Sequence, residues 1–330
     1  MKTVIITGEK SVAIQEVPTP RAFGDFTLVK ILSAPMCTEY KKYFNGTYTI
    51  NPGHEAAGIV AETAASGNLK AGDRVIVMPQ YPCGKCSLCT SGEYIHCENL
   101  VDPRQTTGDE FGTGTYAEYI LKPHWLLLQI PDDISIDEAA MACCGFGPAF
   151  AAGKTMNINA EDTVLITGLG PVGLGAVISS KFRGAKVIGC TRNEFRRKLA
   201  LELGADAVID PSQINLATEG NGVNKVIECS GDSFYQQLAL KTVKRKGEIA
   251  FIGESSELSI NISKDLLRKG LTLHGIWHWN LNDTPEMINL IGSSKEKISK
   301  FITHKFPLAE IEEAFKIQQS GQCGKIILRP

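Results

Sequence analysis

Residues 162–190 read DTVLITGLGPVGLGAVISSKFRGAKVIGC, and this stretch decides the fold. An apolar run ends in a glycine-rich turn, a helical pattern follows, and a second apolar run begins at Ala185, as in a βαβ unit. The glycines have GxGxxG spacing, which permits a tight turn, lets a diphosphate approach the backbone, and lets helix and strand pack closely. An ordinary glycine-rich βα turn is the alternative. The residues expected at a dinucleotide are Gly168, Gly170, Pro171, Val172 and Gly173.

The end of the second strand bears on which dinucleotide binds. Thr191 stands where NAD-binding folds usually carry an acid that accepts hydrogen bonds from the ribose hydroxyls. Without that carboxylate a 2′-phosphate is not repelled, and Arg192 can donate hydrogen bonds to it, with Arg196 and Arg197 at the start of the next helix as further donors. The pattern favours NADP(H) over NAD(H). The alternative is that Arg192 is a solvated loop charge and that both cofactors are accepted.

Beyond this unit, the chain shows two different secondary-structure patterns. Strands and helices alternate up to about residue 253, which predicts an α/β domain with a parallel sheet. The first 140 or so residues are short apolar strands broken by Gly and Pro, which indicates a β-rich domain. We expect a helical stretch over 138–156, helical segments over 284–301 and 308–319, and a last strand over 324–330. The pattern alone does not assign this tail to either domain.

The composition is that of an ordinary globular protein. The 330 residues are 43% hydrophobic and 21% charged with a net charge of −2, which suits two domains and gives no reason to expect nucleic acid or an anionic membrane as partner. The N-terminal residues lack the apolar core of an export signal, and no stretch is long enough to span a bilayer. Ten cysteines in such a chain indicate a cytoplasmic protein and metal ligation.

Four cysteines lie in the run PCGKCSLCTSGEYIHC, residues 82–97. Cys83, Cys86, Cys89 and Cys97 are separated by two, two and seven residues, which suits tetrahedral Zn²⁺ in a closed structural site. An iron–sulfur cluster is the rival, but bacterial ferredoxin sites have their fourth cysteine three residues later and before Pro. Four cysteines without a ligand are the remaining alternative. The spacing predicts a structural zinc ion in a lobe of about residues 80–100.

Three further potential ligands are scattered along the chain. Cys37 follows a predicted strand, His54 lies in PGHEAAGIV, and Cys144 lies in MACCGFGPAF. Taken singly, a buried cysteine behaves as a small hydrophobe, and a histidine near a turn is usually only hydrogen-bonded. Spacing alone therefore leaves their role open.

The chain resembles the zinc-dependent medium-chain alcohol dehydrogenases over essentially its whole length, and in particular their polyol or sorbitol dehydrogenase branch. The likeness rests on motifs in order: GHExxGxV at 53–60, AGDRV at 71–75, the four-cysteine lobe, CGF at 144–146, GLGPVG at 168–173, and the closing FPLAEIEEAF and GKIIL. The family's architecture implies a β-rich GroES-like catalytic domain from residues 1–145 and 279–330. It implies a Rossmann cofactor domain from residues 146–278, and a homodimer or homotetramer.

Residue by residue, the resemblance puts a catalytic zinc ion on Cys37, His54 and Cys144, so two zinc ions are expected per chain. Alignment through CGF favours Cys144 over the adjacent Cys143. Glu55 becomes a nearby carboxylate that orients the site or transiently binds the metal. Two thiolates and one imidazole leave a position for a substrate oxygen, on which zinc acts as a Lewis acid while hydride passes between the substrate and the nicotinamide.

The sequence departs from the family after Cys37. The family has a hydroxyl two residues after this cysteine, which passes the alcohol proton onward, and here that position holds Glu39. Glu39 either takes the proton itself or holds a hydroxyl or ammonium group of a polyol, sugar or aminocyclitol. The third interpretation is an alignment shift of one residue, in which Thr38 supplies the hydroxyl and Glu39 faces solvent.

Further candidate residues of the substrate pocket lie at 275–279, GIWHW. The resemblance makes this segment the strand that lines the substrate cleft and the subunit contact. Trp277 and His278 either shape a pocket for a ring-bearing substrate or belong to an interface core, which is the commoner role of such residues.

The expected function is a zinc-dependent oxidoreductase that moves hydride between a secondary alcohol or polyol, or its ketone, and NADP(H). A zinc-binding module without enzymatic activity would explain the cysteines but not the nucleotide unit. An electron-transfer protein with an iron–sulfur cluster is the third class considered.

Overall fold

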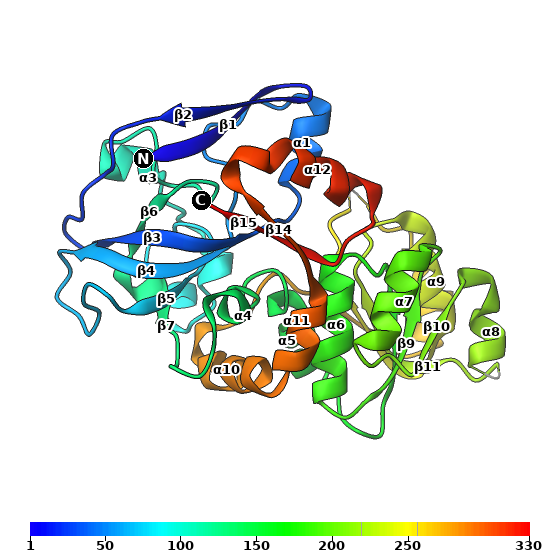
Figure 1. The fold of residues 1–330 in the computed structure, drawn as a ribbon. Coiled ribbons are helices and arrows are strands. Elements are labelled where there is room, and N and C mark those ends of the chain that lie inside the picture. Colours follow the sequence, from blue (N-terminus) through cyan, green and yellow to red (C-terminus); the bar gives the residue numbers. More distant parts are fainter. Residues whose placement is uncertain (219, 256) are drawn as a thin grey trace.

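The glycine-rich stretch folds as predicted, with β8 at Thr163–Thr167, α6 at Pro171–Phe182 and β9 at Lys186–Cys190. The computed structural model describes residues 1–218, 220–255 and 257–330. The other strands of the same sheet are β10 (Ala207–Ile209), β11 (Val223–Glu228), β12 (Val243–Phe251) and β13 (Thr272–Gly275). All pairs are parallel, in the order β10-β9-β8-β11-β12-β13 (Figure 1). The order reverses at β8, which makes its carboxyl end the usual place for a ligand.

Helices pack against this sheet, because an α-helix follows each of the strands β8, β9, β10 and β11. They are α7 (Glu194–Glu202), α8 (Ile214–Ala217) and α9 (Ser233–Thr242), together with α6 and with α5 (Gly147–Thr155). Helix α5 packs on α6, where a Cβ on Gly175 would lie 1.8 Å from the carbonyl oxygen of Gly145. This close approach brings the turn before α5 against the start of the cofactor sheet.

The helical stretch predicted over 138–156 is interrupted in the structure. The chain forms α4 (Ile136–Ala140) and then α5, with a turn at 141–146 between them. A carbonyl that a continuous helix would use internally, that of Ala142, instead accepts a hydrogen bond from the Trp279 indole at 2.8 Å. The apolar composition of the run favours a helix, but this tertiary contact outweighs it. Cys143 and Cys144 consequently lie in the turn.

A second sheet is built from both ends of the chain. Its strands are β3 (Phe26–Pro35), β4 (Ala56–Thr63), β5 (Arg74–Val77), β6 (Tyr119–Pro123), β7 (Leu127–Gln129), β14 (Ile302–Pro307) and β15 (Lys325–Arg329). They follow the order β14-β15-β3-β4-β5-β7, and β6 also pairs with β3. The last strand β15 is antiparallel to β3, so the C-terminal tail returns to the N-terminal sheet. The hairpin of β1 (Lys2–Gly8) and β2 (Ser11–Glu16) lies beside it (Figure 1).

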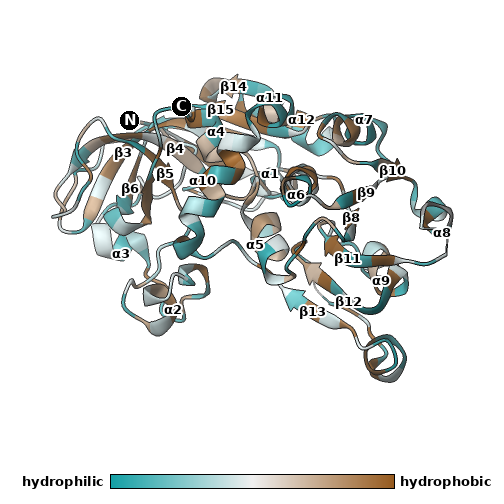
Figure 2. Cartoon of the chain, turned by 90° about the horizontal axis from the view of Figure 1, so that it is seen from below, coloured by the Kyte–Doolittle hydropathy of each residue, from teal (hydrophilic) through white to brown (hydrophobic). Residues whose placement is uncertain are grey.

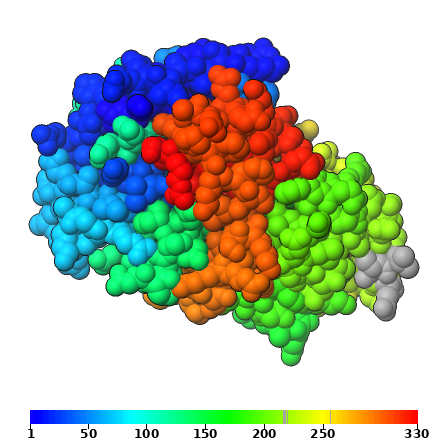
Figure 3. Space-filling view, viewed as in Figure 1, coloured from blue at the N-terminus to red at the C-terminus, as the bar shows by residue number. Residues whose placement is uncertain are grey.

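The tail lies between the two sheets. The remaining helices are α1 (Glu39–Asn45), α2 (Ser87–Thr90), α3 (Pro103–Thr107), α10 (Thr284–Ser293), α11 (Lys295–Phe301) and α12 (Ile311–Ser320). The predicted helical segment at 284–301 is divided at Ser294 into α10 and α11. Both pack on α6, and in Figure 3 the orange residues run as a band between the blue-to-cyan and green halves.

Apolar side chains form one continuous cluster across the junction of the two sheets. It includes Ile76 of β5, Ile166 of β8, Phe146 of the turn and Trp279 of the tail, all buried. Figure 2 shows the brown of apolar residues along strands such as β5 and β11. A junction packed in this way gives a rigid base for side chains that meet there from distant parts of the chain.

The prediction of a strand over 275–279 is wrong. Strand β13 ends at Gly275, and the chain leaves the sheet there. Trp279 turns into the core at 2% exposure, whereas Trp277 remains 45% exposed. His278 between them has a left-handed backbone with φ of +59°, a conformation that a strand cannot include.

Candidate active site

The four-cysteine lobe gathers its sulfur atoms as a tetrahedral ion requires. The Sγ atoms of Cys83, Cys86, Cys89 and Cys97 all lie within 4.8 Å of one another, and three pairs are 3.5 to 3.9 Å apart. A tetrahedral Zn²⁺ with Zn–S bonds of about 2.3 Å needs sulfur atoms about 3.8 Å apart. The short helix α2 and a 3₁₀ turn at Tyr94–His96 bridge the gaps between these cysteines. The four residues therefore fit a structural zinc ion.

Cys37, His54 and Cys144 come together from three separate parts of the chain. Cys37 follows β3, His54 precedes β4, and Cys144 lies in the turn between α4 and α5. Their donor atoms and a carboxylate oxygen of Glu55 lie within 4.8 Å of one another, and His54 Nε2 is 3.2 Å from Cys144 Sγ. Two thiols and one imidazole form the Cys₂His donor set of a catalytic zinc site. The predicted residues fit such an ion.

Glu39, the first residue of α1, supports His54. Its Oε1 is 2.6 Å from His54 Nδ1, while its Oε2 accepts hydrogen bonds from the Tyr116 hydroxyl at 3.0 Å and the Cys37 N–H at 3.2 Å. Burial by itself would raise the pKa of Glu39, but the charge and hydrogen bond of His54 outweigh it and lower the pKa to about 2. At 6% exposure Glu39 does not face solvent, so that part of the realigned interpretation is wrong.

Glu55 lies behind the donor set in a fully buried ion pair. Its Oε1 is 2.7 Å from Lys325 Nζ, and its Oε2 accepts a hydrogen bond from the Cys144 backbone N–H at 3.1 Å. Burial raises the pKa of Glu55 to about 7, and the charge of Lys325 opposes this shift. Sequence reasoning missed Lys325, whose only signal is a lysine inside the apolar strand GKIIL. The adjacent Cys143 directs its Sγ to the carbonyl of Val77 and is not in the donor set.

The glycines of the dinucleotide motif each meet a different steric demand. Gly168 has φ of +78°, and a Cβ there would lie 2.6 Å from Ser230 in the loop after β11. A Cβ on Gly173 would lie 2.0 Å from the carbonyl oxygen of Gly168. Around Gly170 the nearest atom to such a Cβ is Arg196 Nη1, at 3.9 Å. The middle glycine thus opens on free space at the start of α6, where a diphosphate is expected.

A cavity of about 410 Å³ extends from these glycines to the end of β9. Pro171, Val172, Thr191, Arg192 and Arg196 line it. The neighbouring Arg197 turns away and donates hydrogen bonds to the carbonyl oxygens of Val208 and Thr191. Arg192 and Arg196 therefore remain available to an anionic group, and Arg197 does not.

The catalytic donor set opens into a second cavity of about 540 Å³. His54, Cys144, Trp277 and His278 line it, and His278 is 3% exposed with its Nε2 3.5 Å from Cys144 Sγ. Burial lowers the pKa of His278 to about 3, so its ring is neutral. Both cavities are lined by Cys37, Thr38, Lys41, Val172, Cys229 and Ser230. The donor set and the dinucleotide cavity therefore share one cleft.

Comparison with known proteins agrees with this arrangement. Residues 25–132 match the alcohol dehydrogenase GroES-like domain, and residues 171–293 match the zinc-binding dehydrogenase domain. A D-arabitol-phosphate dehydrogenase of Enterococcus avium is 30% identical over 97% of this chain and 94% of its own length. The chain belongs to the zinc-dependent medium-chain dehydrogenases, in their polyol-dehydrogenase-like branch.

Two other relatives extend the comparison of this dehydrogenase. A sorbitol dehydrogenase of Halalkalibacterium halodurans is 29% identical over the whole of this chain and 99% of its own. The crystal structure of a 2R,3R-butanediol dehydrogenase from Bacillus subtilis has a TM-score of 0.86 at 24% identity, covering 100% and 99% of the two chains, and shows the same fold. The predicted class, GroES-like plus Rossmann, is thereby confirmed.

Family membership implies zinc and a nicotinamide cofactor for this dehydrogenase and a small-molecule alcohol as its substrate. The electron-transfer protein and the non-enzymatic zinc module are not supported. Within the described residues, no helix is both long and apolar enough to pass through a bilayer. All ten cysteines, each of which the structure describes, are free thiols.

Proposed function

We propose that the protein moves hydride between a secondary alcohol group of a polyol, or the corresponding ketone, and NADP(H). The observation that carries this proposal is the cleft shared by the Cys37, His54 and Cys144 donor set and the dinucleotide cavity. A nicotinamide that extends from the GxGxxG turn past Val172 would reach the substrate beside these ligands. Sugars and aminocyclitols remain candidate substrates, because the cavity lining is rich in polar groups.

Each residue has a proposed part in this chemistry. Cys37, His54 and Cys144 would hold the zinc ion, which when bound acts as a Lewis acid on the substrate oxygen. Glu39 holds the His54 ring by its Nδ1, so that Nε2 faces the metal position. Because both oxygens of Glu39 are engaged, we assign the proton relay to the Thr38 hydroxyl, whose Oγ1 would accept the alcohol's proton while its own O–H proton passes to solvent in the cleft. Thr38 lines both cavities.

The cofactor preference follows from the charges at the end of β9. Thr191 stands in place of an acid, and Arg192 and Arg196 line the cavity where a 2′-phosphate would lie. Arg192 rests over the Phe234 ring at 5.1 Å, which holds the guanidinium at that place. We therefore expect Arg192→Ala to weaken NADP(H) by at least tenfold and to leave NAD(H) within twofold. Equal losses for both cofactors would refute the assignment.

The remaining features extend the proposal to the whole protein. The catalytic domain would comprise residues 1–145 and 279–330, and the cofactor domain residues 146–278. We also propose a homodimer or homotetramer in the cytoplasm, with two zinc ions per chain, one structural on the four-cysteine lobe and one catalytic.

The decisive experiment combines metal analysis with a substrate screen. Purified protein should contain two zinc ions per chain and should oxidise at least one member of a panel of polyols, polyol phosphates, sugars and aminocyclitols, read at the nicotinamide absorbance with each cofactor. Cys144→Ser should lose one zinc ion and the activity. Cys143→Ser is the matched control, because its side chain is adjacent and buried but outside the donor set. Equal loss in both variants would exclude Cys144 as a ligand.

A further inference from the structure

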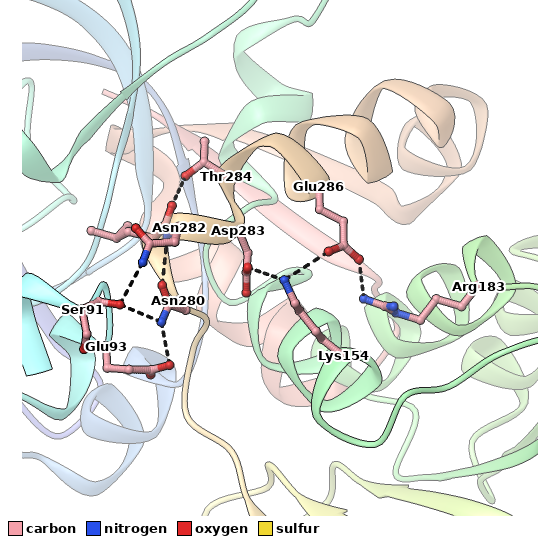
Figure 4. Close-up of polar contacts among 10 residues, drawn as sticks. Ser91, Glu93, Lys154, Arg183, Asn280, Asn282, Asp283, Thr284 and Glu286 are labelled. Atoms are coloured by element: carbon pink, nitrogen blue, oxygen red, sulfur yellow. Dashed lines mark hydrogen bonds and ion pairs between the residues drawn. The ribbon is translucent and has the colours of Figure 1, made fainter.

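A short segment that the proposed chemistry does not use joins the catalytic donor set to the four-cysteine lobe. Residues 278–283 begin beside Cys144 and end against residues 91–93 at the tip of the lobe. Figure 4 shows the lobe end of this segment, with the side chains of Asn280 and Asn282 directed at Ser91 and Glu93.

At the catalytic end, His278 directs one ring nitrogen at a metal-ligand candidate. Its Nε2 lies 3.5 Å from Cys144 Sγ, yet His278 is not among the donor atoms that lie within 4.8 Å of one another. A metal-bound thiolate carries no proton and can only accept a hydrogen bond. The Nε2 of His278 would therefore carry a proton and donate a hydrogen bond to the sulfur. Its Nδ1 is buried and has no hydrogen-bond partner among the described residues.

The backbone of His278 is strained, and neighbouring contacts maintain the strain. A left-handed φ of +59° is uncommon for any residue other than glycine and costs about 1 kcal/mol, although histidine adopts it more often than most side chains do. Trp279 anchors the next position, because its Nε1 donates to the Ala142 carbonyl oxygen and its ring is 2% exposed. A Cβ on Gly147 would lie 2.7 Å from this ring. The indole is thus fixed in the same turn that carries Cys144.

The tip of the four-cysteine lobe is hydrogen-bonded to the other end of the segment. Asn280 Nδ2 donates to the Ser91 carbonyl oxygen at 3.1 Å and to Glu93 Oε1 at 2.7 Å. The backbone N–H of Leu281 donates to the Gly92 carbonyl oxygen at 3.1 Å. Gly92 has φ of +86°, and a Cβ there would lie 2.1 Å from Asn280 Oδ1. Only glycine at position 92 permits this contact.

An ion pair ties the same segment to the cofactor half, because Asp283 pairs with Lys154 of α5. Just beyond the segment, Glu286 of α10 pairs with Arg183 after α6 at 2.9 Å (Figure 4). The segment is therefore held by three parts of the protein at once: the catalytic turn, the lobe and the helices of the cofactor sheet. Such a span is suited to fixing the position of a side chain that it carries.

We propose that His278 is a positioning residue whose Nε2–H donates a hydrogen bond to the Cys144 thiolate, and that the four-cysteine lobe holds it there through Asn280. This inference rests on the proposed catalytic zinc site. The hydrogen bond gives the thiolate a partner and restrains the Cys144 side chain toward the donor set, so the ligand is already placed for the metal. The lobe, besides stiffening its own loop, thereby contributes to the catalytic site.

Three variants of His278 separate the hydrogen bond from the backbone conformation. Alanine removes the donor. Glutamine restores a donor at the distance of Nε2 but is strained at a left-handed φ, whereas asparagine tolerates that φ but is too short to reach the sulfur. The site that a chelator empties first is refilled with Co²⁺ or titrated with zinc, because a three-ligand site exchanges more readily than four thiolates. The readouts are zinc affinity and the thiolate-to-cobalt absorption band.

We expect His278→Ala to bind zinc 10- to 100-fold more weakly at the chelator-labile site and to shift the cobalt band. His278→Gln should restore both, and His278→Asn should not. Rescue by asparagine instead of glutamine would show that only the backbone matters, and an unchanged His278→Ala would remove the role altogether. Either result overturns the proposal. A wild-type protein without any chelator-labile zinc would refute the proposed function itself.

The lobe's part is tested by Asn280→Ala. This variant should retain two zinc ions per chain and should show the same shift of the cobalt band, in smaller degree. Thr90→Ala is the matched control, because the Thr90 hydroxyl bonds only to carbonyls inside the lobe. An unshifted band in Asn280→Ala, or an equal shift in Thr90→Ala, would overturn the coupling between lobe and catalytic site.

Discussion

Replacing Glu39 by glutamine removes one charge and leaves the size of the side chain unchanged. The carboxylate accepts three hydrogen bonds, from His54 Nδ1 at 2.6 Å, the Tyr116 hydroxyl at 3.0 Å and the Cys37 N–H at 3.2 Å. A glutamine side chain accepts hydrogen bonds only through its amide oxygen. Its amide nitrogen would therefore face at least one of these three buried donors. The ring of His54 then loses the anion that holds it, together with a charge-assisted bond.

The magnitude follows from the kind of bond that is lost. Hydrogen bonds to a charged group contribute about 1.5–3 kcal/mol, and each 1.4 kcal/mol corresponds to about tenfold in an equilibrium constant. Glu39→Gln should therefore weaken zinc binding at the catalytic site by about 10- to 100-fold. Tyr116→Phe removes a single neutral donor and should cost tenfold or less.

The assay is zinc competition against a chelator, run beside steady-state kinetics at saturating zinc. A positioning carboxylate predicts weaker zinc binding, with activity largely recovered once zinc saturates the site. A general base predicts unchanged zinc affinity and a loss of kcat that zinc does not restore. The second outcome would refute the role argued from the geometry and return Glu39 to the proton-transfer interpretation.

Three further predictions concern the scaffold. Gly173→Ala should destabilise the fold by several kcal/mol and abolish dinucleotide binding, because the new Cβ would meet the Gly168 carbonyl oxygen. Gly292→Ala is the contrasting variant: a Cβ there meets open space, so it should stabilise α10 by about 0.5–1 kcal/mol. Urea unfolding measures both changes in stability. Cys83→Ser should lose one zinc ion per chain and lower the Tm, and a variant that keeps both ions would exclude the lobe as a zinc site. Burial lowers the pKa of Lys122 to about 7, so between pH 7 and 10 the unfolded chain binds more protons than the folded chain. The free energy of unfolding should therefore rise with pH by about 1.4 kcal/mol per pH unit in that range. Lys122→Met should remove this contribution when urea unfolding is measured at several pH values, and an equal pH dependence in the variant and the wild type would contradict it.

The glycines and the four cysteines were predictable because their function depends on short stretches of chain. Gly168 and Gly173 are five residues apart, and the demand on each comes from one strand, one turn and one helix. Cys83 and Cys97 likewise close a loop of 14 residues. In such stretches spacing largely determines geometry, since few backbone dihedral angles intervene.

Local pattern was misleading where a distant contact opposed it. The apolar run at 138–156 has a helical composition, but Trp279 takes the carbonyl of Ala142 and the chain turns so that Cys144 reaches the donor set. The strand expected at 275–279 is lost for the related reason that Trp279 is drawn into the core. Neither effect of Trp279 can be recognised from the hydrophobic periodicity of the affected segment.

The sequence by itself determined the family, the Rossmann unit and the residue types of both candidate metal sites. Only the tertiary structure decided what surrounds the ligands. It decided that Glu39 bonds His54, that Lys325 reaches Glu55 across 270 residues, and that His278 faces Cys144 across 134. The physical reason is that such pairs form only after two sheets and the returning tail have packed, and their geometry depends on the whole core instead of on any spacing along the chain.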